Sequence, residues 1–273
     1  MKIPITKYHG CGNDFIIAEQ ADLHGMDLAE LAVVLCDRHT GIGADGFIVV
    51  QRDPLEMIFY NQDGSRAPMC GNGIRCFSAY CYDHHIVEEK TFDVETLAGI
   101  QKVTIEEINP YQVCVDMGTP KADLSLLGIK QPIWDLPLTL NNGQEVKLYT
   151  IFMGTIHTVI FTKLDAVSME EVGREICEHP LFEKQTNVNF VEIIDQEHMR
   201  MRTYERGCGM TLACGTGACA SLVCAARLKK LGNKATAILP KGELHLAIDT
   251  NGHVMMSGPA VCIMKGEYAY AGN

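Results

Sequence analysis

The sequence lacks the features that mark nucleic-acid-binding and membrane-spanning proteins. It has no cluster of lysine and arginine, and 34 acidic residues outnumber 23 basic ones, for a formal net charge of −11. This charge disfavours nucleic acid and anionic membranes as partners. The chain has no apolar run long enough to cross a bilayer, and Met1-Lys2-Ile3-Pro4 leads directly into patterned sequence without a secretory signal. We therefore expect a cytoplasmic protein.

The twelve cysteines lack the spacing of a metal site. Structural zinc usually takes Cys-x2-Cys pairs, whereas these cysteines follow one another at five or six residues (70, 76, 81 and 208, 214, 219, 224). The Gly-x-Gly runs have neither a Walker lysine nor a dinucleotide fingerprint beside them. In a mid-sized chain without a signal peptide, the pattern indicates reduced thiols, no metal, and mostly inert packing cysteines.

Two cysteines differ from the rest because they occupy the same local pattern twice. Cys70-Gly-Asn-Gly follows a strand-like run (57–60) and a turn, and it begins a helix pattern that continues to about His84. Cys214-Gly-Thr-Gly follows a strand-like run (199–204) and begins a helix pattern to about Lys230. The free N–H groups at a helix start can bind an anion, and the positive helix end favours a thiolate. Both thiols are therefore candidate reactive groups.

The two patterns lie about half the chain length apart, which predicts two similar halves. Each half has many short strands around one main helix, which is neither alternating βαβ nor an all-β sandwich. We predict an α+β fold of two pseudo-symmetric domains, each a mostly antiparallel sheet wrapped around a central helix. The first domain comprises residues 1–117, to which residues 262–273 return, and the second domain comprises residues 118–261. In sequence, the halves are alike only around their helices.

Polar residues near these motifs have both structural and functional interpretations. Glu205-Arg206 could be an exposed pair of little energetic value, or it could hold a zwitterionic substrate through a guanidinium–carboxylate fork. His157 taken alone would more often be a packed or surface histidine. Four asparagines could be turn or cap residues, or amide contacts to a polar ligand; they are Asn13, Asn61, Asn72 and Asn187.

The motifs together resemble those of the diaminopimelate epimerase family, cofactor-independent amino-acid epimerases of the cell-wall and lysine pathway. The matching segments are His9–Phe15, Asn61–Ser65, Met69–Cys76, Tyr204–Gly207 and Ala213–Ala218. The resemblance covers nearly the whole chain. It implies an isomerase that acts on a small-molecule amino acid, needs no pyridoxal phosphate or other cofactor, and forms a homodimer.

The resemblance also implies a two-base mechanism. Cys70 and Cys214 would act on opposite faces of the substrate α-carbon, one thiolate removing the proton while the other thiol delivers one. N–H groups around Gly71-Asn72 and Gly215-Thr216, together with Asn13, would hold the α-carboxylate. Oxidation could also join the two thiols and inactivate the enzyme.

Other residues take their roles from the same resemblance. His157 and Glu205 would hold the amino group and help to set the protonation of the thiols. The far end of the substrate would be bound by Asn61, Asn187 and Arg206.

Two positions depart from the family pattern. The family usually has Gly-Asn-Pro-His where this chain has Gly154-Thr155-Ile156-His157, and glutamate where it has Met210. The asparagine replaced by Thr155 is one of those that read the distal end of diaminopimelate. A racemase of another amino acid, such as histidine, is therefore an alternative, and a non-catalytic amino-acid-binding relative is an alternative of another class. The retained distal set favours diaminopimelate.

Overall fold

Two units make up the part of the chain that the computed structural model describes, residues 1–270. Unit 1 contains residues 1–115 and the chain from Gly258 onward, and unit 2 contains residues 116–257. The domain boundaries expected from the sequence remain predictions. Residues 271–273, which belong to the segment expected to return to the first domain, lie outside the described residues. Among residues 1–270, no helix is long and apolar enough to cross a membrane.

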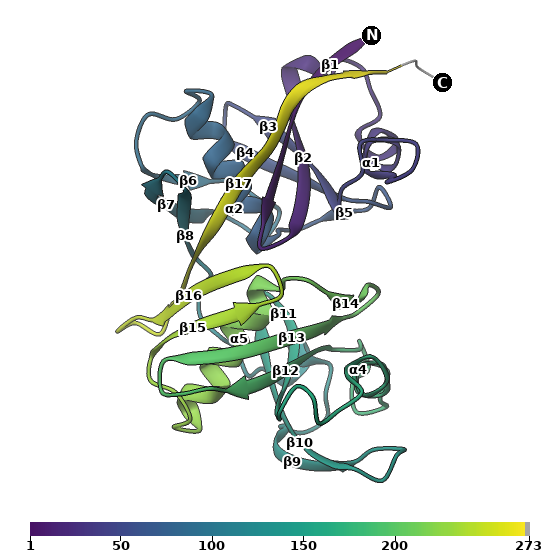
Figure 1. Ribbon diagram of the computed structural model, residues 1–273, viewed down its shortest axis with the longest axis vertical. Coiled ribbons are helices and arrows are strands. Elements are labelled where there is room, and N and C mark those ends of the chain that lie inside the picture. Colours follow the sequence, from purple (N-terminus) through teal and green to yellow (C-terminus); the bar gives the residue numbers. More distant parts are fainter. Residues whose placement is uncertain (271–273) are drawn as a thin grey trace. The chain divides into compact units, whose positions relative to one another are not determined.

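The helices and strands of unit 1 follow one another along the chain (Figure 1). They are β1 (Lys2–Gly10), β2 (Asn13–Glu19), the 3-10 helix η1 (Gln20–Asp22), α1 (Leu28–Cys36), β3 (Gly46–Gln51), β4 (Glu56–Asn61), β5 (Arg66–Ala67), α2 (Gly71–Asp83), β6 (Thr91–Val94), β7 (Gln101–Ile108) and β8 (Tyr111–Asp116).

Unit 2 contains the remaining elements. They are α3 (Leu124–Leu127), β9 (Trp134–Thr139), β10 (Glu145–Met153), β11 (Thr155–Phe161), α4 (Met169–Cys177), β12 (Asn187–Ile193), β13 (His198–Glu205), β14 (Gly209–Thr211), α5 (Gly215–Arg227), β15 (Lys234–Leu239) and β16 (Gly242–Ile248). The last strand, β17 (Val254–Ala269), begins in unit 2 and ends in unit 1.

The two units share a strand order that goes beyond their central helices. In unit 1, β1 pairs antiparallel with β2, β2 parallel with β3, and β3 antiparallel with β4. In unit 2, β10, β11, β12 and β13 pair in the same sequence of directions. The two halves are thus alike in sequence only around their helices, whereas their strand pairing agrees over four strands. Strand pairing depends on backbone direction, so different side chains preserve it without an obvious sequence repeat.

Each unit packs one helix on each face of this sheet. In unit 1, α1 buries Leu31 and Leu35 in an apolar cluster with Phe47, and α2 packs against β1 and β2 on the other side. In unit 2, α4 contributes Val172 and Ile176 to a similar cluster, and α5 packs against β10, β11 and β12. The α+β class predicted from the sequence is confirmed.

The central helices α2 and α5 are almost completely buried, because their sequences are rich in glycine, alanine, serine and cysteine. Small side chains let a helix backbone approach a sheet closely. The buried hydroxyls need partners, and they find them within the helix: Ser78 donates to the Ile74 carbonyl and Ser221 to the Gly217 carbonyl, each at 2.7 Å. Both helices end near the predicted positions, at Asp83 and Arg227.

The sequence pattern indicates two short strands at the end of the chain, near 253–257 and 260–268, where the structure has the single strand β17 of 16 residues. Its first part pairs with β16 as far as Ser257, and its later part pairs with β1 from Val261. Gly258 and Pro259 lie between the residues that pair with β16 and those that pair with β1, and β17 also pairs with β8. The strand therefore continues through a dipeptide that usually marks a break.

A substitution at Gly173 tests the packing of α4. A Cβ at this buried position would lie 2.6 Å from Cβ and 2.7 Å from Cγ of Tyr204. We expect Gly173→Ala to lower the free energy of unfolding by about 1–3 kcal/mol, despite the better helix propensity of alanine. The control is Gly232→Ala, where the Cβ meets no atom within 4 Å. Urea denaturation measures both variants, and equal stability of the two would contradict this packing.

Candidate active site

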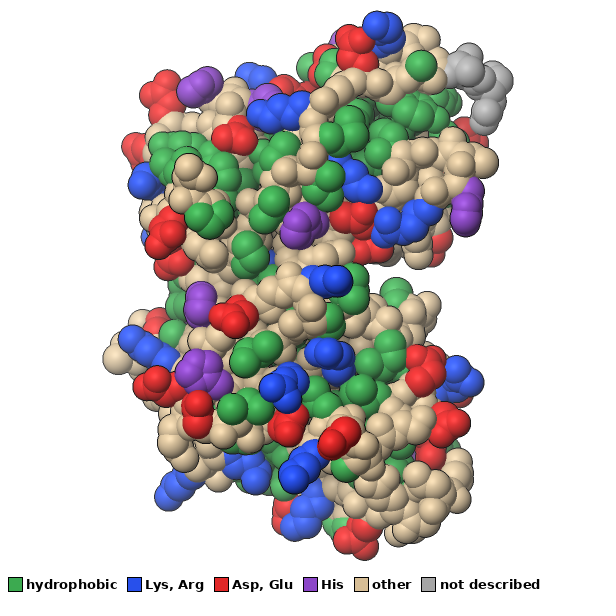
Figure 2. All heavy atoms as spheres, in the orientation of Figure 1, with side chains coloured by type: hydrophobic (Ala, Val, Ile, Leu, Met, Phe, Trp, Pro, Cys, Tyr) green, Lys and Arg blue, Asp and Glu red, His purple; other side chains and the backbone are tan. Residues whose placement is uncertain are grey.

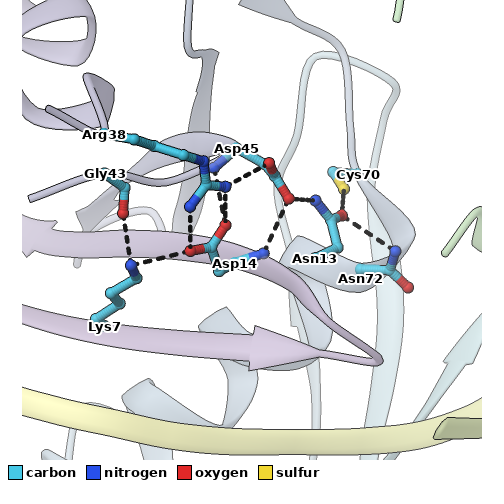
Figure 3. Close-up of polar contacts among 8 residues, drawn as sticks. All are labelled: Lys7, Asn13, Asp14, Arg38, Gly43, Asp45, Cys70 and Asn72. Atoms are coloured by element: carbon cyan, nitrogen blue, oxygen red, sulfur yellow. Dashed lines mark hydrogen bonds and ion pairs between the residues drawn. The ribbon is translucent and has the colours of Figure 1, made fainter. Parts of the chain in front are cut away.

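Cys70 lies at the start of α2 in unit 1, among the residues predicted to surround it. It is the N-cap residue, with extended backbone, and its Sγ accepts the Gly73 N–H at 3.4 Å. The Sγ lies 3.8 Å from Oδ1 of Asn13, and Nδ2 of Asn72 donates to the same oxygen at 3.1 Å. Figure 3 shows these side chains converging at the helix start. Unit 1 thus brings Asn13, Cys70, Gly71 and Asn72 together.

A charged network holds the Asn13 amide in place (Figure 3). Nδ2 of Asn13 donates to Asp45 at 2.6 Å, so its Oδ1 is the atom that faces the thiol. Arg38 bridges Asp45 and Asp14 at 2.8 and 2.7 Å. Burial raises the pKa of Asp14, but its hydrogen bonds to Arg38 and Lys7 outweigh this and hold the pKa below the usual value.

Sequence reasoning missed Asp45, although an acidic residue directly after Gly41-Ile-Gly43-Ala44 was available as a signal. The position became informative only when the turn brought Asp45 beside the start of β2, where its Oδ2 also accepts the Asp14 N–H at 3.2 Å.

Cys214 occupies the corresponding position before α5 in unit 2. It is 6% exposed, and its Sγ lies 3.6 Å from Oγ1 of Thr216. Burial and the nearby carboxylate of Glu205 raise the pKa of the Cys214 thiol well above its usual value, while hydrogen bonds from Thr216 and the Gly217 N–H lower it. The N–H group at the helix start thus favours the Cys214 thiolate, as expected for this position, but burial has the larger effect on the pKa.

His157 is fully buried in β11 and lies beside the same thiol. Its Nε2 is 3.0 Å from Oγ1 of Thr216, and its Nδ1 is 3.2 Å from Nδ2 of Asn189. Burial, with a smaller effect of Arg206, lowers the pKa of His157 to about 3. The imidazole is consequently neutral at physiological pH.

The remaining predicted residues of unit 2 lie close to one another at the ends of strands. Glu205 ends β13 and accepts a hydrogen bond from the Thr211 hydroxyl at 2.6 Å. The Arg206 N–H donates to Oδ1 of Asn187 at 2.9 Å, and the exposed guanidinium donates to the Lys184 carbonyl at 2.7 Å. Unit 2 therefore groups Cys214, Thr216, His157 and Glu205, and separately links Asn187 to Arg206.

Three further positions are less closely tied to these groups. Thr155 is half-buried and begins β11, directly after Gly154 with its positive φ of 73°. Met210 packs against the apolar cluster that contains Tyr204. Asn61 ends β4 and donates to Oγ of Ser65 at 2.9 Å, so its described contact is with its own turn rather than with Cys70.

The arrangement offers thiol chemistry rather than a metal site. Among residues 1–270, no group of three or more histidine, cysteine, aspartate or glutamate side chains is placed to hold a metal ion. No disulfide joins any two of the twelve cysteines. On the face in Figure 2, acidic and basic side chains are interspersed over the surface of each unit. Each unit presents one thiol at a helix start, surrounded by hydrogen-bonding groups.

Solved structures with the same fold come from one class of two-unit α+β proteins. A phenazine-biosynthesis protein of the PhzF family from Bacillus anthracis matches with a TM-score of 0.71, over 99% of this chain and 100% of that chain, at 15% identity. A probable proline racemase from Agrobacterium radiobacter matches with a TM-score of 0.67, over 98% and 93%, at 16% identity. At these identities the likeness defines the fold class.

The sequence comparisons are more specific. The family model described as diaminopimelate epimerase matches residues 5–122 and 149–263. A diaminopimelate epimerase from Pelotomaculum thermopropionicum is 40% identical over 276 residues, covering 97% of this chain and 98% of the relative. The chain belongs to the diaminopimelate epimerase family and is an enzyme of the racemase and epimerase class. The resemblance identified from the motifs is confirmed.

The buried neutral His157 predicts a pH-dependent stability. Its pKa rises from about 3 in the folded protein to 6.5 in the unfolded chain, so the unfolded state binds the extra proton. This stability is fully present above pH 6.5 and is lost as the pH falls toward 3. Between pH 7.5 and 4.5, we expect the wild type to lose about 3 kcal/mol more than His157→Gln, because that variant has no imidazole to protonate.

Urea denaturation of both proteins across this range measures the difference. Carboxylates titrate in both proteins, so their contribution cancels. Parallel stability curves for wild type and variant would contradict the assignment of a neutral histidine.

Proposed function

We propose that this enzyme is a diaminopimelate epimerase that inverts one α-carbon through a thiolate and a thiol, Cys70 and Cys214, without pyridoxal phosphate or a metal. The observation that carries the proposal is the presence, in each unit, of one cysteine at the start of a buried helix within reach of polar groups. The curated relative at 40% identity carries the same name over nearly its full length.

The proposed chemistry needs two bases because a single base would tend to return the proton to the face from which it came. One thiolate removes the weakly acidic α-proton while the other thiol protonates the opposite face, so the two cysteines exchange protonation states in each turnover. At Cys214, Glu205 would accept the thiol proton, and the donors Thr216 and Gly217 N–H would stabilise the thiolate. At Cys70, the Gly73 N–H is the donor to sulfur.

The substrate would be held by backbone and side-chain donors. N–H groups in the first turns of α2 and α5, around Gly71-Asn72 and Gly215-Thr216, would bind the α-carboxylate and stabilise charge that develops on it. Asn13 would complete this set through its hydrogen-bonding contacts with Cys70 and Asn72. His157 and Glu205 would face the amino group. The Arg206 guanidinium, together with Asn61 and Asn187, would bind the distal carboxylate.

The second candidate is a racemase of another amino acid such as histidine. The observation that favours it is Thr155, which begins β11 in place of the family's usual asparagine. A hydroxyl provides one donor on a short stem, whereas an asparagine amide provides two donors and an acceptor at greater reach. The departure at Met210 has a packing explanation, because its side chain lies against the apolar cluster of unit 2.

The proposal includes a cytoplasmic homodimer, which the family resemblance suggests. Sedimentation equilibrium of the purified protein at micromolar concentration tests the assembly. A monomer mass at all concentrations would contradict the proposed homodimer.

Single cysteine substitutions test the two-base scheme. We expect Cys70→Ala and Cys214→Ala each to reduce the rate of epimerisation by at least about a thousandfold. Loss of either cysteine leaves one face of the α-carbon without a group that can remove or deliver a proton. The control is Cys262→Ser, an exposed cysteine that should leave the rate within about twofold. Turnover is followed by the optical rotation of the substrate. Full activity in either alanine variant would refute the scheme.

Deuterium exchange identifies the substrate. Incubation in deuterated water with LL-diaminopimelate or L-histidine, in separate reactions, should give α-deuterium incorporation only with diaminopimelate, measured by proton NMR. Exchange with histidine alone would select the second candidate, and Thr155→Asn should then lower that activity. Exchange with neither amino acid would contradict both candidates.

A further inference from the structure

A buried asparagine that the proposed chemistry does not use contacts His157. Asn189 is the third residue of β12 and is completely buried. Side chains alternate across a strand, so Asn189 lies on the same face as Asn187, whereas Val188 and Phe190 join the apolar cluster on the other face. A Cβ at Gly217 of α5 would overlap Oδ1 of Asn189, so the asparagine lies directly under the first turn of the central helix.

The hydrogen bonds of Asn189 determine which way its amide points. Nδ2 lies 3.2 Å from the Thr158 carbonyl oxygen, which can only accept a hydrogen bond. The Thr203 hydroxyl donates to Oδ1 on the other side, at 3.1 Å. The nitrogen must therefore face Thr158, and its second proton is directed at Nδ1 of His157, 3.2 Å away. This orientation follows from the chemistry of a backbone carbonyl and not from an arbitrary choice between O and N.

The amide orientation has a consequence for the histidine ring. An imidazole nitrogen that accepts a hydrogen bond from Asn189 carries no proton itself. In the neutral ring, the one proton therefore resides on Nε2. Nε2–H then donates to Oγ1 of Thr216 at 3.0 Å. Since this oxygen accepts from the ring, the threonine proton is directed elsewhere, and Sγ of Cys214 lies 3.6 Å away.

We propose that Asn189 is a positioning residue that fixes the Nε2–H tautomer of His157 and thereby makes the Thr216 hydroxyl a donor to the Cys214 sulfur. The series of hydrogen bonds runs from Asn189 through His157 and Thr216 to Cys214, with each group donating to the next. It involves neutral groups only; the charged groups near it are Glu205, beside the thiol, and Arg206, which acts on the histidine. Its catalytic consequence rests on the proposed function, but its existence does not.

Unit 1 indicates that the fold does not require a polar residue at this position. The third residues of β2 and β3 are Phe15 and Ile48, and they correspond to His157 and Asn189 as the third residues of β11 and β12. A Cβ at Gly73 would meet Ile48 and Phe15 at 3.3 and 3.5 Å, where Gly217 faces Asn189. An apolar pair thus fills the same space beneath α2. The polar pair of unit 2 therefore calls for a role other than packing.

Nitrogen-15 NMR of histidine-labelled enzyme, without substrate, tests the tautomer directly. In the wild type we expect an unprotonated Nδ1 and a protonated Nε2 for His157, unchanged from pH 6 to 9; the resonance is assigned by its absence in His157→Gln. In Asn189→Asp the carboxylate has no N–H to donate and can only accept a hydrogen bond. The imidazole proton of His157 should therefore move to Nδ1. The matched control is Thr203→Val, which removes a buried hydroxyl from the same network but leaves the Thr158 carbonyl, and it should keep the wild-type tautomer.

A second readout follows the sulfur. Carbon-13 shifts of labelled cysteine Cβ report thiol ionisation, and we expect Asn189→Asp to raise the midpoint for Cys214 by about one pH unit, a tenfold lower thiolate fraction. The exposed Cys262 should keep its midpoint and serves as the reference in the same spectrum.

The NMR result is independent of turnover, so it can fail while the proposed epimerase activity stands, and the reverse also holds. A proton on Nδ1 in the wild type would overturn the proposal. So would an unprotonated Nδ1 in Asn189→Asp, or a tautomer change in Thr203→Val. An unchanged Cys214 midpoint in Asn189→Asp with a switched tautomer would overturn the link through Thr216.

Discussion

The close approach of a small-residue helix to a sheet is the constraint on which both half-sites depend. A side chain at Gly217 would overlap Asn189, so the first turn of α5 requires glycine at its third residue, and one at Gly73 would press closely on Ile48 and Phe15 beneath α2. That placement puts a cysteine at each helix start, and at Cys70 the Gly73 N–H donates to the sulfur. The positions of both thiols thus depend on the packing of these helices.

The same backbone arrangement supports two different electrostatic environments. Around Cys70, charged side chains orient the Asn13 amide, because Asp45 accepts from its nitrogen and leaves the oxygen facing sulfur. Around Cys214, a neutral chain of hydrogen bonds passes through the buried His157. A repeated topology therefore does not imply equivalent thiols. Under the proposed two-base scheme, unequal surroundings would help the two thiols to hold opposite protonation states at the start of a turnover.

The family relationship explains most, though not all, of the residues around these thiols. The cysteines, the glycines that follow them and the Glu205-Arg206 pair all lie within the residues that the family model matches. Met210 departs from the motif in favour of packing against the cluster around Tyr204. Thr155 has no such packing explanation at the half-buried start of β11, and the proposed second candidate therefore rests on this position.

The sequence by itself determined the α+β class and the helix that follows each Cys-Gly-x-Gly motif, because glycine spacing and apolar periodicity act locally along the chain. The residues expected near each thiol came instead from the resemblance of the motifs to a known family. It could not determine the full repeat of strand pairing, the continuous strand β17, or the roles of Asp45 and Asn189. Those depend on which strands become neighbours: Asn189 is an ordinary strand residue until the parallel pairing of β11 and β12 brings it to Nδ1 of His157. Only the tertiary structure shows the burial that raises the pKa of the Cys214 thiol, because that burial is absent from the sequence pattern.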